Sequence, residues 1–332
     1  AVPVQTLVLP LSIAPMIDWS YSHFRVLMRL MAPNALLYTE MVTTGAILNH
    51  FHQISHIHCS EPPLALQIGG ADKKDLVRCV HQVADIFAEI NLNLGCPSDR
   101  VQKGHFGACL MKEQALVSDC IKAMKDTTCT PITAKIRIGI DDNDGYDFFY
   151  NFAQALIEAG CDKLIIHARK AWLKGLSPKQ NRTIPPLHYD YVYRLKQAFP
   201  DVPMIINGNI TSIEAVQTHL TQVNGVMIGR LACENPYAIA HIHHALYPHK
   251  PVVTRTALVT QYLACMQTHH LVDKPLSLIL KPIMNMAHGL PNAKYWKKCL
   301  LEAQQSKNLA LLNQALDWLG HIENLTEDST DI

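Results

Sequence analysis

Polar side chains of several chemical types, together with two glycines and a Pro-Met pair, stand at the ends of short apolar runs along the chain. In order they are Pro15 and Met16, Glu40, Gln67, Asn93 with Cys96, Lys135 with Arg137, His167, Asn207–Gly208–Asn209 and Gly229–Arg230. Barrels built from alternating strands and helices carry their chemistry at the carboxyl ends of the strands. The set therefore predicts one ligand-binding face.

Cys96 has the residue type best suited to chemical work in this set. It stands between Gly95 and Pro97, where the chain must turn sharply as it leaves an apolar run. A thiol in such a place can act as a nucleophile or as a general acid, and spacing alone does not decide between them. No second cysteine stands at Cys-x-x-Cys spacing, so we do not expect disulfide exchange.

Lys135, His167 and Gln67 would reach the same face from inner strands. A lysine inside a barrel can form a Schiff base, or it can place a cation opposite an electron-rich ring. A flavin that receives hydride gains negative charge near N1 and the C2 carbonyl, which Lys135 would stabilise. Gln67 could bind the amide edge of that ring, whereas His167 alone is typical of a buried core histidine.

The last two runs are followed by residues suited to phosphate. Asn207, Gly208 and Asn209 follow the seventh run, and Gly229 and Arg230 follow the eighth. Glycines let backbone N–H groups approach an anion, and a helix N-terminus with an arginine adds positive potential. Loops after strands seven and eight are the common phosphate site of such barrels.

The elements that must position these residues alternate between strand and helix. The predicted strands are 8–14, 36–40, 64–67, 89–94, 132–137, 163–167, 204–207 and 225–228. These runs are nearly continuous in apolar residues and do not alternate, as expected for parallel strands covered on both faces. With amphipathic stretches such as 73–87, 114–125 and 146–159 between them, the pattern predicts an α/β fold, a (β/α)8 TIM barrel.

Strand signals stop after about Pro248. Stretches 254–267, 276–288, 293–304 and 309–319 all have apolar faces at helical spacing, with prolines at the breaks. We therefore expect residues 1–245 to form the barrel and residues 246–332 to form a C-terminal helical bundle.

Composition narrows the class of protein and its partners. The 332 residues have 29 basic and 28 acidic side chains, yet Arg169–Arg182 and Pro275–Leu301 hold basic residues and no acid. No apolar run is long enough to cross a bilayer and no basic start of a signal peptide is present, so we expect a cytoplasmic protein without a membrane partner. The ten cysteines lack zinc-like spacing, so we expect neither a metal nor structural disulfides.

Several stretches of the chain match one known pattern. They are residues 14–19 (APMIDW), 37–46 (LYTEMVTTGA), 91–102 (NLNLGCPSDRVQ), 106–111 (FGACLM), 137–142 (RIGIDD), 166–173 (IHARKAWL), 175–179 (GLSPK), 181–182 (NR) and 184–187 (IPPL). On these residues the chain resembles the tRNA-dihydrouridine synthase family, most closely its A type. The resemblance covers nearly the whole chain.

The resemblance implies an FMN-bound barrel whose helical C-terminal domain holds tRNA. It implies reduction of uridine to 5,6-dihydrouridine in the D-loop, at positions 20 and 20a, with NADPH reducing the flavin and no obligate protein partner. The implied FMN ligands are Pro15, Met16, Ile17, Gln67, Lys135, His167, Asn207, Gly208, Asn209, Gly229 and Arg230.

The resemblance also assigns substrate contacts. Reduced FMN would give hydride to uracil C6 while Cys96 protonates C5, and Asn93 would touch the uracil. The implied tRNA contacts are Lys179, Arg182, Lys294 and Lys297. In members of the family, the last two positions resemble arginines. Lysine keeps the positive charge there but loses the bidentate phosphate geometry of arginine.

Three other functions share parts of this pattern. A flavin barrel that reduces a free pyrimidine would need neither of the acid-free basic stretches. A Schiff-base aldolase would use Lys135 and would be colourless. A tRNA-binding folding aid would carry a flavin without needing Cys96.

Overall fold

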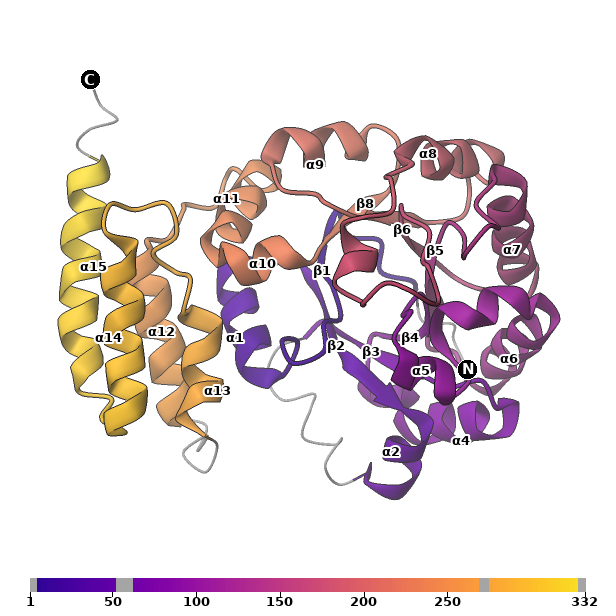
Figure 1. Cartoon of the computed structure of the whole chain (residues 1–332), viewed down its shortest axis with the longest axis horizontal. Coiled ribbons are helices and arrows are strands. Elements are labelled where there is room, and N and C mark those ends of the chain that lie inside the picture. Colours follow the sequence, from indigo (N-terminus) through magenta and orange to yellow (C-terminus); the bar gives the residue numbers. More distant parts are fainter. Residues whose placement is uncertain (1–4, 52–61, 269–274, 328–332) are drawn as a thin grey trace. The chain divides into compact units, whose positions relative to one another are not determined.

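Eight parallel strands close into one barrel in the computed structural model, which describes residues 5–51, 62–268 and 275–327. Each strand pairs with the next along the chain, and β8 pairs back with β1 (Figure 1). The strands are β1 Leu11–Ile13, β2 Leu36–Thr43, β3 Leu64–Gly69, β4 Glu89–Leu94, β5 Ile132–Arg137, β6 Leu164–His167, β7 Met204–Asn207 and β8 Gly225–Ile228. The predicted (β/α)8 barrel is confirmed.

The chain forms two compact units. The first comprises residues 1–20 and 36–229, and the second comprises residues 21–35 and 230–332. Helices of the first unit are α2 Thr44–Asn49, α4 Lys73–Val83, η1 Ala84–Ile86, α5 Asp99–Lys103, η2 Gly107–Lys112, α6 Gln114–Thr127, α7 Tyr146–Glu158, η3 Gln180–Arg182, α8 Tyr189–Ala198 and α9 Ile213–Leu220. The first unit contains the whole barrel.

The described part of the second unit is helical. Its helices are α1 Ser22–Met31, α10 Arg230–Glu234, α11 Pro236–Leu246, α12 Arg255–Thr268, α13 Leu276–Leu280, η5 Lys281–Ile283, α14 Ala293–Ser306 and α15 Leu311–Glu327. The N-terminal helix α1 packs against α11 and α12. A helical C-terminal part was predicted, whereas the inclusion of α1 was not. The functional division at residues 245 and 246 stays a prediction.

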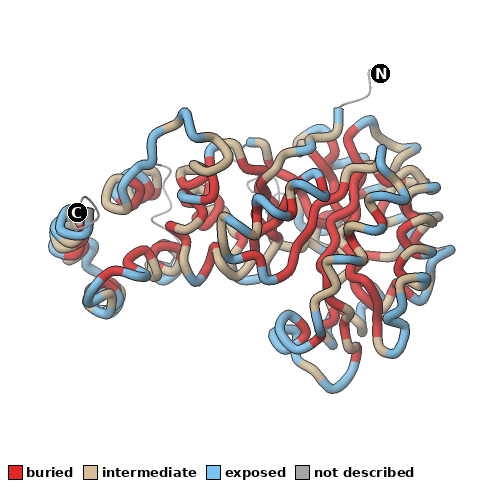
Figure 2. Tube along the Cα trace, turned by 90° about the horizontal axis from the view of Figure 1, so that it is seen from above, coloured by how far each residue is buried: buried red, intermediate tan, exposed pale blue. Residues whose placement is uncertain are grey.

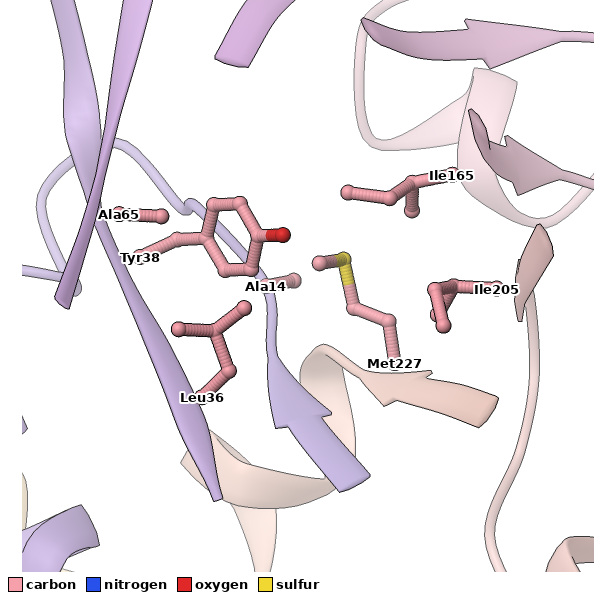
Figure 3. Close-up of a cluster of buried hydrophobic side chains, with 7 residues drawn as sticks. All are labelled: Ala14, Leu36, Tyr38, Ala65, Ile165, Ile205 and Met227. Atoms are coloured by element: carbon pink, nitrogen blue, oxygen red, sulfur yellow. The ribbon is translucent and has the colours of Figure 1, made fainter. Parts of the chain in front are cut away.

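The strands lie in the buried interior of the first unit. Figure 2 shows them as the continuous buried segments, with exposed residues on the outer faces of the helices. One apolar layer inside the barrel consists of Ala14, Leu36, Tyr38, Ala65, Ile165, Ile205 and Met227 (Figure 3). This layer fills part of the barrel interior, which in an eight-stranded barrel is packed with side chains.

Local signals in the sequence fix where several helices begin and end. The side chains of Asp72 and Ser212 accept hydrogen bonds from the backbone N–H groups of Asp75 and Ala215, which caps α4 and α9. Gly160 follows α7 with φ +102°, a left-handed conformation that glycine adopts without strain. The helix end predicted at Gly160 is therefore confirmed.

Two local predictions were wrong. The stretch 276–288 is not one helix, because α13 ends at Leu280 and a 3-10 turn follows. Pro282 has no backbone N–H and its ring would clash with the preceding turn of an α-helix. Strands β4 and β5 also alternate, contrary to prediction: buried apolar residues such as Ile90 and Ala134 flank the polar positions.

Candidate active site

Strand register brings the predicted polar residues to adjacent places at the carboxyl end of the barrel. Asn93 is opposite Lys135, Arg137 is opposite His167, and His167 is opposite Asn207. Because side chains alternate along a strand, residues two apart share the inner face. These residues therefore line the carboxyl end of the barrel, which we call the barrel mouth, as predicted.

The Cys96 turn, residues 95–97, is held by hydrogen bonds on both sides. Asn93 Oδ1 accepts from the backbone N–H groups of Gly95 and Cys96, each at 3.0 Å. Arg137 Nε donates to the Gly95 carbonyl at 3.0 Å. The half-buried Cys96 thiol lies 3.7 Å from Ser98 Oγ, so the thiol has a fixed place at the barrel mouth.

The same turn is closed by a glycine with no room for a side chain. The Cys96 carbonyl accepts a hydrogen bond from the Ala108 N–H at 2.8 Å. Gly107 has φ +78°, and a Cβ there would lie 2.5 Å from the Cys96 carbonyl oxygen. The glycine in the sequence FGACLM is therefore required by the position of Cys96.

Lys135 places an ammonium group at the barrel mouth that has no partner within the described ranges. Among the residues that the structure describes, none accepts a hydrogen bond from its Nζ or forms an ion pair with it. Burial and the charge of Arg137 lower the pKa of Lys135 to about 8, with a smaller contribution from Arg182 and an opposing one from Cys96. An unpaired cation with a weakened hold on its proton favours an anionic or electron-rich ligand.

His167 is buried and neutral. Burial, followed by the charges of Arg137 and Lys135, lowers its pKa well below the usual range. The backbone of Gly208 approaches this ring closely: a Cβ on Gly208 would lie 3.0 Å from His167 Cδ2, and φ at Gly208 is +125°. The glycine thus lets the loop after β7 pass against the histidine.

The ends of β1, β7 and β8 complete this side of the mouth. Gly229 lies near Met16, since a Cβ on Gly229 would be 3.9 Å from Met16 Sδ. Ser20 Oγ accepts from the Met16 N–H at 2.9 Å and donates to the Ala14 carbonyl, which fixes the turn containing Pro15.

Exposure differs among the predicted cofactor residues in this region. Ile17 is 54% exposed, whereas Asn207 is buried and donates to the Met227 carbonyl at 3.0 Å. Asn209 is exposed and has φ +50°. Arg230 follows Gly229 in the chain and begins α10 of the second unit.

The loop after β6 carries exposed cations to the mouth. Lys179 and Arg182 are exposed on either side of Gln180 and Asn181. Arg182 is close enough to lower the pKa values of both Lys135 and His167. Arg137 Nη1 donates to the Asn181 carbonyl at 2.8 Å, so this loop is attached to the strand that carries Lys135.

The second unit has its own cluster of predicted substrate contacts. Lys294 and Lys297 are exposed on α14, three residues apart and therefore on one helix face. Both line a cavity of about 130 Å³ together with Asn285 and His288. Their predicted contact with tRNA stays a prediction.

Three residues near the site, Glu89, Asn91 and Thr133, were not singled out from the sequence, and Arg137 was named there without its structural role. Arg137 joins the Cys96 turn to the loop after β6. Glu89, Asn91 and Thr133 form a buried polar column behind Gln67 and Asn93. The alternation of polar and apolar residues in β4 and β5 was the signal for this column.

No group of three or more metal-ligating side chains occurs among the described residues. All nine described cysteines are free thiols. Nor does any helix in the described ranges have both the length and the apolar character needed to span a bilayer.

Known proteins resemble this chain over most of its length. The family model described as dihydrouridine synthase (Dus) matches residues 12–319. The tRNA-dihydrouridine(20/20a) synthase of Shewanella oneidensis is 49% identical over 293 residues, 88% of each chain. Those of Vibrio parahaemolyticus and Synechocystis are each 44% identical and cover 92% and 89% of this chain, and 95% and 89% of their own lengths.

One solved structure shows the same fold at low sequence identity. A 2-naphthoyl-CoA reductase complex aligns with a TM-score of 0.54 at 9% identity, over 74% of this chain and 51% of that one. At such identity the likeness concerns the fold alone.

Proposed function

The chain belongs to the dihydrouridine synthase family, and from that premise we propose that it reduces uridine to 5,6-dihydrouridine at positions 20 and 20a of the tRNA D-loop. Family membership makes it an NAD(P)H-dependent oxidoreductase and a flavoprotein of tRNA processing. The Schiff-base aldolase is thereby excluded. The specific positions, the cofactor FMN, the donor NADPH and a cytoplasmic location are parts of the proposal.

FMN fits the residues at the barrel mouth. Lys135 offers an unpaired ammonium beside a neutral His167, which suits the electron-rich edge of the ring. The left-handed backbone at Gly208 and Asn209 suits a phosphate cradle, since no side chain at Gly208 blocks the approach. The proposed FMN ligands are Pro15, Met16, Ile17, Gln67, Lys135, His167, Asn207, Gly208, Asn209, Gly229 and Arg230.

The protein's own part in the reaction is to hold the uracil and deliver a proton. When bound, FMN reduced by NADPH supplies the hydride for uracil C6. Cys96 delivers the proton to C5, because its thiol is fixed at the mouth by the Asn93 and Arg137 hydrogen bonds. One Nδ2 hydrogen of Asn93 is donated to Gln67, and the second Nδ2 hydrogen binds the base.

Exposed cations bind the tRNA backbone. Lys179 and Arg182 do so from the loop after β6, and Lys294 and Lys297 do so from α14. Such contacts compensate for unstacking of the target base, which costs a few kcal/mol. Net charge is only +1, so local clusters and not the overall charge carry this interaction.

The position of Cys96 is the observation that carries the proposal. We expect Cys96→Ala to retain bound flavin and to lose most dihydrouridine formation on an unmodified tRNA transcript. Cys109 is the matched control, since its thiol is also half-buried but donates to the Phe106 carbonyl and has no hydrogen bond to Asn93 or Arg137 among the described contacts. Full turnover by Cys96→Ala, or an equal loss in Cys109→Ala, would contradict the assignment of Cys96 as the acid.

A further inference from the structure

A buried carboxylate lies inside the barrel beneath the candidate active site. Glu89 is 1% exposed and accepts hydrogen bonds from Lys163 Nζ at 2.6 Å, from Thr133 Oγ1 at 2.8 Å and from the Tyr38 hydroxyl. Figure 3 shows the Tyr38 ring directed into the barrel, with its hydroxyl toward Ile165. Burial and the charge of Glu89 raise the pKa of Tyr38 well above its usual range, so the phenol keeps its proton and donates.

The Glu89 carboxylate determines which group donates and which accepts in each hydrogen bond above it. An ionised carboxylate only accepts, so the single hydroxyl hydrogen of Thr133 must point at Glu89. Thr133 Oγ1 can then only accept from Asn91, whose Nδ2 lies at 2.8 Å. The Asn91 carbonyl oxygen consequently faces Gln67 and accepts from its Nε2 at 2.9 Å.

The direction continues to the Cys96 turn. Gln67 Oε1 accepts from Asn93 Nδ2 at 3.1 Å. Asn93 Oδ1 accepts from the backbone N–H groups of the turn, both at 3.0 Å. One chain of hydrogen bonds thus leads from Glu89 to Cys96, and its members all belong to the barrel unit.

Neither end of this chain can be reversed. Its lower end is a carboxylate, which cannot donate, and its upper end is a pair of backbone N–H groups, which cannot accept. Rotating any one side-chain amide by half a turn would exchange its N and O atoms. A donor would then face a donor at one neighbour, and an acceptor would face an acceptor at the other. Each such mismatch leaves buried polar groups without a partner, so the three amides have one favoured orientation.

We propose that Glu89, Thr133 and Asn91 are positioning residues for the reaction, because they fix the amide orientations of Gln67 and Asn93 and thereby the Cys96 turn. The catalytic part of this inference rests on the proposed function. Both acceptor sites of Asn93 Oδ1 are used by the turn, so this residue offers a bound ring only a donor. A donor there fits a ring carbonyl oxygen, as in uracil, and not a ring N–H.

Thr133→Val tests this chain of hydrogen bonds with little change in side-chain volume. Valine removes the hydroxyl between Glu89 and Asn91, so the orientation of the amides is no longer imposed from below. We expect the backbone N–H groups of Gly95 and Cys96 to exchange with deuterium about tenfold faster in the full-length protein. We also expect kcat for dihydrouridine formation to fall about tenfold while KM for tRNA changes less than about twofold, since the exposed tRNA contacts are untouched.

Thr130→Val is the matched control. It is the same substitution of a buried threonine, just before β5, but this hydroxyl donates to the Ala84 carbonyl at 2.9 Å and has no hydrogen bond to Asn91. We expect wild-type exchange at the Cys96 turn in this variant. Thr133→Ser restores the hydroxyl and should restore both exchange and kcat to within about twofold of wild type.

A second break keeps the inference testable if Thr133→Val does not fold. Asn91→Leu nearly preserves volume but removes both the donor that faces Thr133 and the acceptor that faces Gln67, so faster exchange at the Cys96 turn is expected again. Unchanged exchange in Asn91→Leu, or equal effects of Thr133→Val and Thr130→Val, would overturn the inference. The proposed function fails separately, if wild type makes no dihydrouridine while Thr133→Val still accelerates exchange.

Discussion

The lysine at the barrel mouth gives the account a quantitative test. Lys135 has no partner among the described residues, and burial together with Arg137 lowers its pKa to about 8. A lysine in water has a pKa of about 10.4. Because its pKa is lower, Lys135 loses its charge at a pH at which the protein can still be handled. If the charged form binds the flavin ring, affinity for FMN must fall as pH rises through about 8.

The size of the effect follows from the charged fraction of Lys135. With a pKa of about 8, roughly nine tenths of the group is charged at pH 7 and roughly one tenth at pH 9. We therefore expect FMN affinity to fall about tenfold between these values. His167 does not contribute, because its lowered pKa keeps it neutral throughout the range.

Flavin fluorescence measures this directly, in a titration of flavin-free full-length protein with FMN at several pH values. Lys135→Met should bind more weakly than wild type at pH 7 and show less than about a twofold change up to pH 9. Lys170→Met is the control, since the Lys170 ammonium is paired with Asp144 at 2.8 Å and should leave the wild-type pH dependence intact. A wild-type affinity that is constant from pH 7 to 9, or a tenfold fall that persists in Lys135→Met, would refute the reasoning.

Three further outcomes follow from contacts in the structure. Gly208→Ala should lower the free energy of unfolding by about 1–3 kcal/mol in urea titrations, because φ is +125° and the His167 ring is in the way; Gly145→Ala, with open space around it, should be neutral. Lys163→Met should cost about 3–5 kcal/mol in the same assay by leaving its buried carboxylate partner unpaired, and an effect below 1 kcal/mol would contradict that. Lys294→Ala and Lys297→Ala should each reduce the salt dependence of tRNA binding by about one unit of slope, and an unchanged slope would remove them from the interface.

Much of the fold could be predicted because its signals are local. Strand ends from β4 to β8 were placed within one residue, since each run stops at a polar residue or just before a glycine. The break after Leu280 could also have been predicted, because Pro282 forbids a continuous helix there. The packing of α1 with the C-terminal helices could not, since it joins segments about 200 residues apart and depends on tertiary contacts.

The candidate site divides in the same way. Cys96, Lys135 and His167 were found because their residue types and their places at strand ends carry chemical meaning. Their tuning was hidden, because the pKa of Lys135 depends on burial and on Arg137, which act only in the folded barrel. The buried column of Glu89, Thr133 and Asn91 had a visible trace in strand alternation, but its direction needed the hydrogen-bond partners.

The central claim is that this barrel reduces uridine in the D-loop of tRNA. The most direct measurement is to incubate unmodified tRNA with the full-length protein, FMN and NADPH, and to map dihydrouridine by mass spectrometry of nuclease fragments. We predict dihydrouridine at positions 20 and 20a, dependent on NADPH. The absence of dihydrouridine at these two positions, whether or not it forms at other positions of the tRNA, would contradict the claim.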